Sequence, residues 1–403
     1  MKILCVFGRN AYGDAARGEG YEHANFLPAL HALGHETVLF ESFDRSAYVD
    51  FAEMNRAFLR AIETQRPGAV LCVLMGYELW TETLDRARTL CAGPIINWGT
   101  DDSWKYEQFA RYIAPHVDCY ATTSARAFEQ AQRDGHTNVV LTQWAAGERA
   151  LAAPLPASQC RYKVSFVGSA YGNRRRWIER LARRGIHVHC FGYGWPKGPV
   201  AAADIPRIVR ESVISLNFGD SGLHLRGLWL YRSRQIKARV FEVPGAGGFL
   251  LTEAADGLDQ FYDDGGEIAV FDSEEQLADR IHYYLEHPDE RDRVALAGHE
   301  RTVRMHTYTR RFQDLLAESC HRVNHRRAST AVTTLTDPAE KHRRTVWLRV
   351  LRVLLVVPLS VLFGKTRGAR AARRLLFELS WRVTGAKTYS ASGWPGRLFY
   401  RES

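Results

Sequence analysis

Cysteine is scarce and scattered in this chain of 403 residues, and its spacing excludes two common uses of the residue. The cysteines are odd in number, and no two stand in the CxxC spacing of a zinc site or a redox motif. They are Cys5, Cys72, Cys91, Cys119, Cys160, Cys190 and Cys320. This pattern favours a reducing compartment over a framework of disulfides.

The first residues do not have the pattern expected of a secretory leader. Met1 runs directly into KILCVFG, which is shorter than the apolar core of a signal peptide and is followed by Arg9 and Asn10 instead of a cleavage site. Together with the scattered cysteines, this predicts a cytoplasmic protein.

Acidic residues are nearly absent from the last part of the chain, and this absence explains the net charge. From Lys341 onward, 14 Lys and Arg accompany only Glu378 and Glu402, a local charge of +12 against +9 for the whole chain. The first 340 residues therefore carry about −3. Nucleic-acid binding calls for a basic groove with aromatic residues, so a charge confined to an apolar tail makes that class the least favoured, and no nucleic-acid partner is expected.

Apolar segments alternate with helical ones through the first 325 residues. The predicted strands are 2–8, 36–41, 68–76, 94–99, 117–123 and 138–144, then 162–169, 186–192, 212–219, 248–253 and 267–272. Helices are predicted at 21–33 and 47–66. Such alternation is typical of α/β domains with a parallel sheet covered on both faces, which bind ligands at the carboxyl ends of their strands.

A stretch of small residues with two prolines, near 150–160, has the composition of a linker and separates the two series of strands. The sequence therefore predicts two doubly wound, Rossmann-like domains that face a cleft, at 1–150 and 151–325. A linker and a basic amphipathic helical tail follow at 326–403.

The stretch RQIKARVFEVPGAGGFLLTE, residues 234–253, combines basic residues, one glutamate and a glycine-rich bend. It predicts a short helix carrying Gln235, Lys237, Arg239 and Glu242, a turn over 244–248 and a buried strand over 249–252. A dinucleotide fingerprint needs a strand before its glycines and a helix after them, so this order argues against an NAD site. A carboxylate beside the bend suits a vicinal diol, because its two oxygens can accept two hydrogen bonds.

Four segments resemble the CgeB and YkvP-like glycosyltransferases, in order and with similar spacing. They are FVGSAYGNRRRWIERL (166–181), ISLNFGDSG (214–222), QIKARVFEVPGAGGFLLTE (235–253) and the segment 256–311, which begins DGLDQFYDDGGEIAVFD. In the first half, PALHALGHETVLFE and INWGTDDSWKY are similar to the family's N-terminal region. The resemblance implies a GT-B architecture, with a nucleotide-sugar donor on the C-terminal domain and acceptor access from the N-terminal one.

The resemblance also implies a donor site. Glu242 matches the glutamate that accepts hydrogen bonds from the donor ribose, and the diphosphate would be held by arginines and by backbone amides of the glycine bend. Two alternatives stay open: Glu242 could form an ion pair with a nearby base, and residues 174–176 could be only the basic face of a helix. The predicted donor set is Gly168, Arg174, Arg175, Asn217, Lys237, Arg239, Glu242, Gly245, Gly247 and Gly248.

An inverting transfer needs a general base on the acceptor side. Asp101 and Asp102 follow the predicted strand 94–99 and could raise each other's pKa, and His23 near the start of the first helix is a third candidate. One aspartate could instead cap the next helix, and an isolated histidine is often structural. Arg234 stands eight positions before Glu242, where many retaining GT-B enzymes carry a second glutamate, so inversion and retention both stay open.

No metal and no other cofactor is expected. His187 and His189 share one face of a predicted strand, but the sequence shows no third ligand and no DxD-like metal motif where one would be needed. GT-B enzymes generally bind the charge of the donor with helix ends and basic side chains, so the resemblance implies a nucleotide-sugar as co-substrate only.

The tail contains VWLRVLRVLLVVPLSVLFG, residues 346–364, which is close to the length of a membrane span. Arg349, Arg352 and Pro358 interrupt it, and a central arginine costs on the order of 2.5 kcal/mol or more in a bilayer. Basic segments on both sides attract anionic lipids, so residues 341–382 are expected to lie on an anionic membrane surface, at the inner face of the cytoplasmic membrane. The alternative is a pair of helices that docks on the body or on a partner protein.

Two functions therefore stand ahead of nucleic-acid binding. The first is a peripheral membrane glycosyltransferase, hexosyltransferase-like and metal-independent, that moves a sugar from a nucleotide-sugar to a hydroxyl acceptor. That acceptor would be a cell-envelope or surface glycan, a lipid-linked intermediate or a small molecule. The second is a catalytically inactive nucleotide-sugar-binding scaffold or sensor at the membrane, which would keep Glu242 and lack a productive base.

Overall fold

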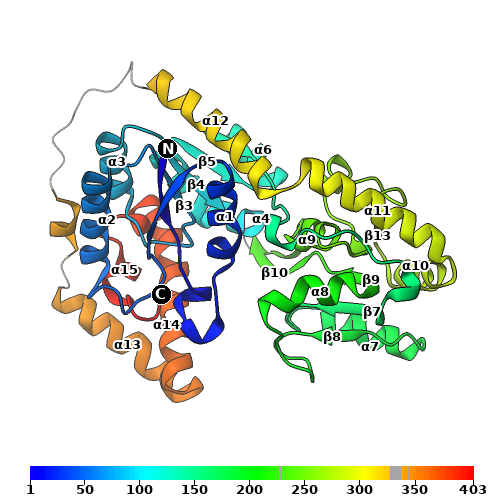
Figure 1. The fold of residues 1–403 in the computed structure, drawn as a ribbon. Helices are drawn as coiled ribbons and strands as arrows, with labels where there is room; N and C mark the ends of the chain where they lie inside the picture. Colours follow the sequence, from blue (N-terminus) through cyan, green and yellow to red (C-terminus); the bar gives the residue numbers. More distant parts are fainter. Residues whose placement is uncertain (227–228, 327–336, 343–344) are drawn as a thin grey trace. The chain divides into compact units, whose positions relative to one another are not determined.

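The computed structural model describes residues 1–226, 229–326, 337–342 and 345–403 (Figure 1). The chain divides into two compact units, a first unit of Met1–Thr142 with Gln313–Ser403 and a second unit of Gln143–Phe312. Each unit contains its own parallel sheet, which confirms the two predicted Rossmann-like α/β domains. The boundaries differ from the prediction, because the end of the chain groups with the first unit instead of forming a separate segment.

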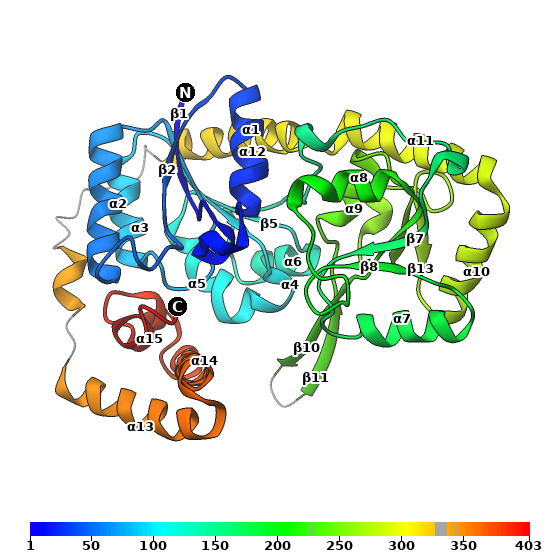
Figure 2. The same cartoon turned by 60° about the horizontal axis from the view of Figure 1, so that its bottom comes forward.

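The sheet of the first unit has six parallel strands in the order β2-β1-β3-β4-β5-β6. They are β1 (Lys2–Val6), β2 (Glu36–Phe40), β3 (Ala69–Cys72), β4 (Ile95–Gly99), β5 (Cys119–Thr122) and β6 (Val139–Leu141). The helices that accompany them are α1 (Tyr21–Ala32), α2 (Phe51–Gln65), α3 (Thr81–Leu90), α4 (Asp102–Lys105), α5 (Arg111–Ile113) and α6 (Ala125–Arg133). Right-handed crossovers put α1 on one face of the sheet and α2 and α3 on the other, as Figures 1 and 2 show.

Helix α2 begins later than predicted for a local reason. The Asp50 side chain accepts a hydrogen bond from the backbone N–H of Glu53 at 3.0 Å, which caps the first turn. From that start, Phe51, Phe58 and Ile62 follow at helical spacing and are buried in the core. The cap therefore fixes which face of the helix meets the sheet.

The sheet of the second unit has five parallel strands in the order β13-β12-β9-β7-β8. They are β7 (Tyr162–Val167), β8 (His189–Phe191), β9 (Ser212–Asn217), β12 (Leu250–Glu253) and β13 (Ala269–Phe271). The helices are α7 (Arg174–Arg183), α8 (Ile205–Arg210), α9 (Arg239–Gly245), α10 (Glu274–Glu286) and α11 (Pro288–Met305), and α12 (Tyr308–Arg326) crosses the boundary between the units.

Two separate apolar cores lie on the two faces of this second sheet. Helices α7, α10 and α11 contribute Leu181, Ile281 and Val294 to one core, and α8 and α9 contribute Ile208 and Phe241 to the other. In Figure 2, α8 and α9 lie above strands β7 and β8, and α7 lies below them. A parallel sheet covered on both faces leaves its carboxyl edge as the place for a ligand.

Two features of the second unit differ from the prediction. A β-hairpin of β10 (Asp220–Arg226) and β11 (Trp229–Arg234), which pair antiparallel, was not predicted. Helix α9 begins only at Arg239, so Gln235 and Lys237 precede it, and it continues through Pro244. The predicted order of helix, glycine bend and strand is otherwise as observed.

The end of the chain forms α13 (Val346–Phe363), α14 (Lys365–Thr384), a 3-10 helix (Gly385–Tyr389) and α15 (Trp394–Leu398). Two of its aromatic side chains, Tyr389 and Tyr400, belong to the main core of the first unit. Tyr400 lies edge-on to Phe51, with ring centroids 4.8 Å apart, and Tyr389 lies 5.6 Å from Phe109. The segment from α14 onward therefore packs on the first unit, as in the alternative of a helix pair that docks on the body.

Candidate functional site

Part of the predicted donor set, namely Gly168, Arg174, Lys237 and Arg239, meets at the carboxyl edge of the second sheet. The loop 168–173 leaves the end of β7, and the segment just before α9 lies beside it. Lys237 Nζ donates a hydrogen bond to the Tyr171 hydroxyl at 3.0 Å, and Arg174 Nη2 donates to the same oxygen at 3.2 Å. A side chain at Gly168 would come within 3.0 Å of Arg239 Nη1, so the glycine leaves room for that guanidinium. The fold thus gathers three cations from two segments about 65 residues apart in the sequence around one tyrosine.

Arg174 is the buried centre of this cationic cluster. The residue is 1% exposed, its Nη1 donates to the Ser169 carbonyl at 2.8 Å, and its guanidinium lies 4.1 Å from the Tyr171 ring centroid. Burial, assisted by the charge of Arg239, lowers the pKa of Arg174 to about 10. The side chain is therefore a positive group held in place, not a solvated face of α7.

The pKa values of its neighbours show a positive local field. Burial lowers the pKa of Lys237, and the charges of Arg174 and Arg239 add to this effect although the Tyr171 hydroxyl opposes it. Burial by itself would raise the pKa of Tyr171, yet the three cations bring that pKa below its ordinary value. Such a site favours an anion, because each negative charge brought in relieves the repulsion among the cations.

Four buried polar atoms in this region lack a hydrogen-bond partner among the described residues. They are Asn173 Oδ1, Arg174 Nε, Arg239 Nη1 and Asn217 Oδ1. At the end of β9, Asn217 Nδ2 donates to Thr252 Oγ1 at 2.9 Å. A buried donor without an acceptor costs about 1–3 kcal/mol, so such atoms usually meet a ligand or water. Arg239 Nη1 is placed to bind an anionic oxygen beside Gly168.

Glu253 is a site-forming residue that the sequence reasoning missed. It is 2% exposed, its Oε2 accepts hydrogen bonds from the backbone N–H groups of Gly219 and Asp220 at 2.9 and 3.2 Å, and its Oε1 lies 3.1 Å from Arg234 Nε. These contacts hold the loop after β9. A glutamate at the end of the otherwise apolar strand GFLLTE was the signal for it.

Glu242, the predicted ribose ligand, lies in the first turn of α9 and is half-buried. Because α9 starts at the carboxyl edge, Glu242 is within one turn of that edge. Lys237, one of the bases considered as its partner, donates to Tyr171. The position is consistent with a role beside the cationic cluster.

The glycine bend is a correction to the predicted donor set. The N–H groups of Gly247 and Gly248 donate to the carbonyls of Pro244 and Val243 at 3.0 and 2.9 Å, so they are engaged in closing α9. A Cβ at Gly245, Gly247 or Gly248 would lie 2.6 Å or less from a neighbouring atom. These glycines precede β12 at the opposite edge of the sheet, where they allow close packing and cannot hold the diphosphate.

Arg175 is also directed elsewhere. Its Nη2 donates to the carbonyl oxygen of Gly194, and its guanidinium lies 5.5 Å from the Trp195 ring. Arg175 therefore supports the loop after β8, while Arg174 joins the cationic cluster.

In the first unit, Asp102 is a buried carboxyl group at the start of α4, three residues after the end of β4. It is 3% exposed and accepts a hydrogen bond from the Tyr120 hydroxyl at 3.0 Å. Burial raises its pKa to about 6, although hydrogen bonds from Thr122 and Tyr120 oppose the shift. A Cβ at Gly99 would lie 2.1 Å from Asp102 Oδ2, so only glycine fits beside it.

Asp101 is the more accessible of the two aspartates. Its side chain is 30% exposed and lies 3.5 Å from Lys105 Nζ, and it makes no capping hydrogen bond to α4. Glu22, which the sequence reasoning did not single out, lies near it: burial raises the pKa of Glu22, and the charge of Asp101 adds to the rise. His23 is held by Glu19, with its Nδ1 2.5 Å from Oε1. Asp101 and Glu22 are thus brought together, and His23 belongs to a separate pair.

Among the described residues, no group of three or more His, Cys, Asp or Glu side chains is arranged to hold a metal ion. The His187 and His189 rings lie 4.8 Å apart in an edge-on arrangement. Only His189 belongs to β8.

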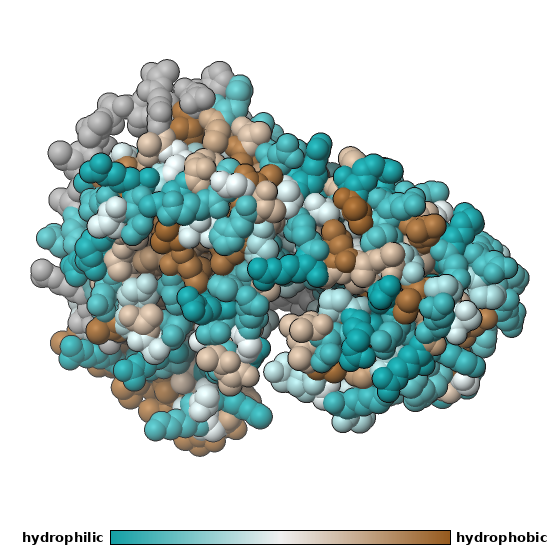
Figure 3. All heavy atoms as spheres, viewed as in Figure 1, coloured by the Kyte–Doolittle hydropathy of each residue, from teal (hydrophilic) through white to brown (hydrophobic). Residues whose placement is uncertain are grey.

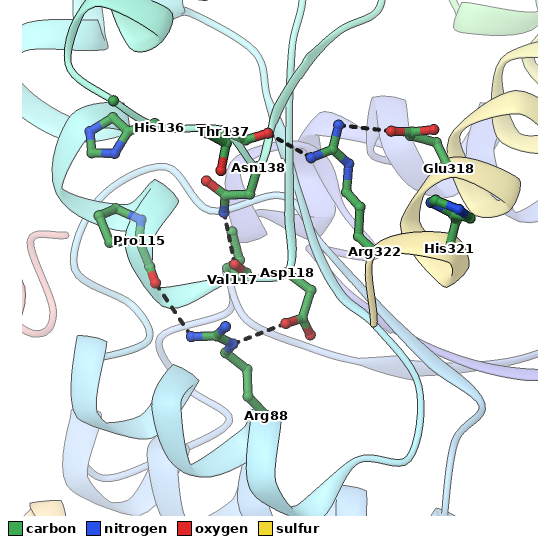
Figure 4. Close-up of a pocket in the computed structure, with 11 residues that line it drawn as sticks. Arg88, Pro115, Val117, Asp118, His136, Thr137, Asn138, Glu318, His321 and Arg322 are labelled. Carbon is green, nitrogen blue, oxygen red and sulfur yellow. Dashed lines mark hydrogen bonds and ion pairs between the residues drawn. The ribbon is translucent and has the colours of Figure 1, made fainter. Parts of the chain in front are cut away.

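An open hollow of about 670 Å³ in the first unit lies at the other edge of its sheet (Figure 4). It is lined by residues that precede β5 and β6 and by α12, so it opens at the amino ends of the strands. Its charged groups are paired: Arg88 Nε lies 3.0 Å from Asp118 Oδ1, and Arg322 reaches between Thr137 and Glu318. The hollow therefore does not lie at the carboxyl edge of the sheet, and the charged pairs named here leave no excess charge for a donor or acceptor.

Comparisons with known proteins bear on the second unit and on the fold. Residues 174–317 match a family model described as "Glycosyl transferase-like". No curated protein sequence matches this chain.

Solved structures that match most of this chain share its fold. The chain is similar to a sucrose-phosphate synthase from Thermosynechococcus elongatus, with 11% identity, a TM-score of 0.54 and coverage of 82% of this chain and 100% of that one. It is similar to a glycosyltransferase from Rickettsia africae, with 10% identity, a TM-score of 0.51 and coverage of 80% and 98%. It is also similar to HepE from Anabaena, solved with UDP and glucose, with 12% identity, a TM-score of 0.50 and coverage of 79% and 99%. The chain therefore has the two-domain GT-B fold of glycosyltransferases.

Proposed function

We propose that the protein is a glycosyltransferase whose second unit binds a nucleotide-sugar donor through its diphosphate. The observation that carries the proposal is the cluster of Arg174, Lys237 and Arg239 at the carboxyl edge of the sheet. Two buried guanidinium nitrogens of this cluster, Arg174 Nε and Arg239 Nη1, have no acceptor among the described residues. The family match over 174–317 and the UDP bound in the HepE structure support the same class of ligand.

In this proposal the cations act on the leaving group. The bond between the anomeric carbon and the diphosphate oxygen breaks, a bond to the acceptor oxygen forms, and negative charge develops on the departing nucleoside diphosphate. Fixed positive groups stabilise that charge without reorganising, and no metal is needed for the purpose. Glu242 would accept hydrogen bonds from the ribose hydroxyls.

On the acceptor side, we assign the general base to Asp101. Its side chain is accessible, whereas Asp102 is enclosed and bonded to Tyr120, so Asp102 is better suited to hold the loop in place. A base takes the proton of the attacking hydroxyl, which requires direct contact with the acceptor.

The finer identity is that of the CgeB and YkvP-like enzymes, acting on a cell-envelope or surface glycan or a lipid-linked acceptor. The segments quoted from residues 166–311 support this assignment.

The test is transfer of labelled sugar from UDP-, GDP- and dTDP-sugars to an envelope fraction, using the full chain. Glu242→Ala should raise the KM for the donor, and Asp101→Asn should lower kcat by about 100-fold with little change in KM. An unchanged donor affinity in Glu242→Ala would remove the ribose assignment. Nucleotide binding without transfer to any acceptor would favour the inactive scaffold over the enzyme.

A further inference from the structure

Helix α13 presents an apolar face to solvent. This exposure is unexpected, because α13 is the most apolar of the described helices. By length and composition α13 could cross a membrane, and no other helix in the described part of the chain is both long and apolar enough to do so. Its outward residues, Val350, Val353, Leu354, Val357 and Val361, are 52% to 81% exposed. Figure 3 shows apolar side chains gathered along the lower left of the view, where α13 and α14 lie in Figure 1. Soluble proteins rarely leave such a continuous apolar stripe uncovered.

The opposite face of α13 packs against the rest of the first unit. Leu348 is fully buried, and Leu351, Leu355 and Leu359 pack at helical spacing against a small core that includes Leu376 and Phe399. The two faces of the helix therefore have separate roles, one inside the first unit and one outside.

The two arginines within α13, Arg349 and Arg352, lie in different environments. Arg352 is turned inward, where it pairs with Glu402, donates to the Leu398 carbonyl and lies 4.7 Å from the Phe399 ring centroid. Of the two arginines of α13, only Arg349 is exposed. The outward stripe between Val350 and Val361 carries no charge.

Helices α13 and α14 form a tight hairpin. A Cβ at Gly368 would lie 2.4 Å from the backbone of Ser360, so the two helices approach to a distance that only glycine permits. Gly364 makes the turn with a positive φ of 79°. The hairpin is thus a fixed surface and not a loose extension.

Positive charge lies next to the apolar stripe. On α14, Leu375, Leu379 and Val383 are exposed at a spacing of four residues. Arginines occupy the exposed positions beside them, namely Arg367, Arg370, Arg374 and Arg382. An apolar face bordered by arginines is complementary to a layer of acyl chains beneath anionic headgroups.

We infer that the α13–α14 hairpin binds the surface of an anionic bilayer and lies flat in it. The valine and leucine stripe of α13 enters the acyl boundary, and the arginines of α14 contact the headgroups. Crossing the bilayer would require Leu348, Leu351 and Arg352 to leave their partners in the first unit, so the packing favours an in-plane position. This placement is independent of whether the enzyme transfers sugar.

The test is sedimentation of the full chain with vesicles of phosphatidylcholine alone or mixed with phosphatidylglycerol. We expect binding to the mixed vesicles that weakens with salt, and release by alkaline carbonate. Val357→Asp with Val361→Asp should reduce binding about tenfold or more. Arg370→Gln with Arg374→Gln should reduce it about fivefold per charge on anionic vesicles only.

The control is Val49→Asp, because Val49 and Val361 have the same exposure, 81%, and Val49 lies outside the hairpin. It should bind vesicles as the parent does, and melting curves should show all variants folded. Three results would overturn the inference: no binding to anionic vesicles, binding that survives Val357→Asp with Val361→Asp, or resistance to carbonate, which would mean a spanning helix. Self-association without lipid, dispersed by the same substitutions, would make a second copy of the chain the occupant and would also overturn it.

Discussion

The buried carboxyl group of Asp102 makes a quantitative prediction about pH. Its pKa is about 6 in the folded chain against an ordinary value of 3.8, because burial disfavours the charged form. At a pH between these two pKa values, the native state binds more protons than the unfolded state. The free energy of unfolding that Asp102 contributes therefore falls as pH rises from about 4 to about 6. A difference of about two units corresponds to roughly 3 kcal/mol.

Asp102→Asn removes this titration while keeping an oxygen that can accept from Tyr120. The free energy of unfolding of the variant, minus that of the parent, should therefore rise by about 2–3 kcal/mol between about pH 4 and pH 7. Urea unfolding followed by tryptophan fluorescence at a series of pH values measures this difference, and groups that titrate alike in both proteins cancel.

Asp134→Asn is the matched control with the opposite sign. Burial works to raise the pKa of Asp134, but hydrogen bonds from Tyr106 and Gln130 and the charge of Arg111 hold it below the ordinary value. Asp134 therefore contributes stability that is present above its unfolded pKa and lost as pH falls, so this variant should lose stability relative to the parent at higher pH. A flat difference for Asp102→Asn, or one of the same sign in both variants, would refute the burial argument.

Two further predictions concern packing and the loop after β9. Gly368→Ala places a Cβ against the Ser360 backbone and should lower the free energy of unfolding by about 1–3 kcal/mol, seen as a lower Tm by calorimetry; an unchanged Tm would mean that the hairpin is loose. Arg234→Met leaves the buried Glu253 without its ion pair and should cost about 1–3 kcal/mol, whereas Arg280→Met, which removes an ion pair with the exposed Asp264, should cost less than about 1 kcal/mol. Equal losses would show that Glu253 does not depend on Arg234.

Most of the fold was predictable because parallel strands that are buried on both faces consist of continuous apolar residues in the sequence. Runs such as KILCVFG and YKVSFVGS correspond to β1 and β7. The hairpin of β10 and β11 was missed, although the alternation of Leu223 and Leu225 with His224 and Arg226 was a signal for it.

The candidate site was predictable only in part. Arg174, Lys237 and Arg239 were singled out by charge, but their convergence on Tyr171 depends on which loops share an edge of the sheet. The glycine bend was misread because local sequence cannot distinguish a glycine that admits a phosphate from one that admits a neighbouring helix. Likewise, the sequence alone indicates that Arg352 opposes membrane contact. In the structure, Arg352 pairs with Glu402, fifty residues later, and so does not lie on the outward face.

The most direct test of the donor site is a calorimetric titration of the full chain with UDP, GDP, dTDP and CMP, repeated with Arg239→Gln. Arg180→Gln is the control, because Arg180 pairs with Glu274 and lies outside the cationic cluster. We expect at least one nucleotide to bind the parent and Arg180→Gln alike, and to bind Arg239→Gln about 10- to 100-fold more weakly, as loss of a charge-assisted hydrogen bond requires. No binding by any of these nucleotides, or equal affinity in Arg239→Gln, would contradict the placement of the diphosphate at the carboxyl edge of the second sheet.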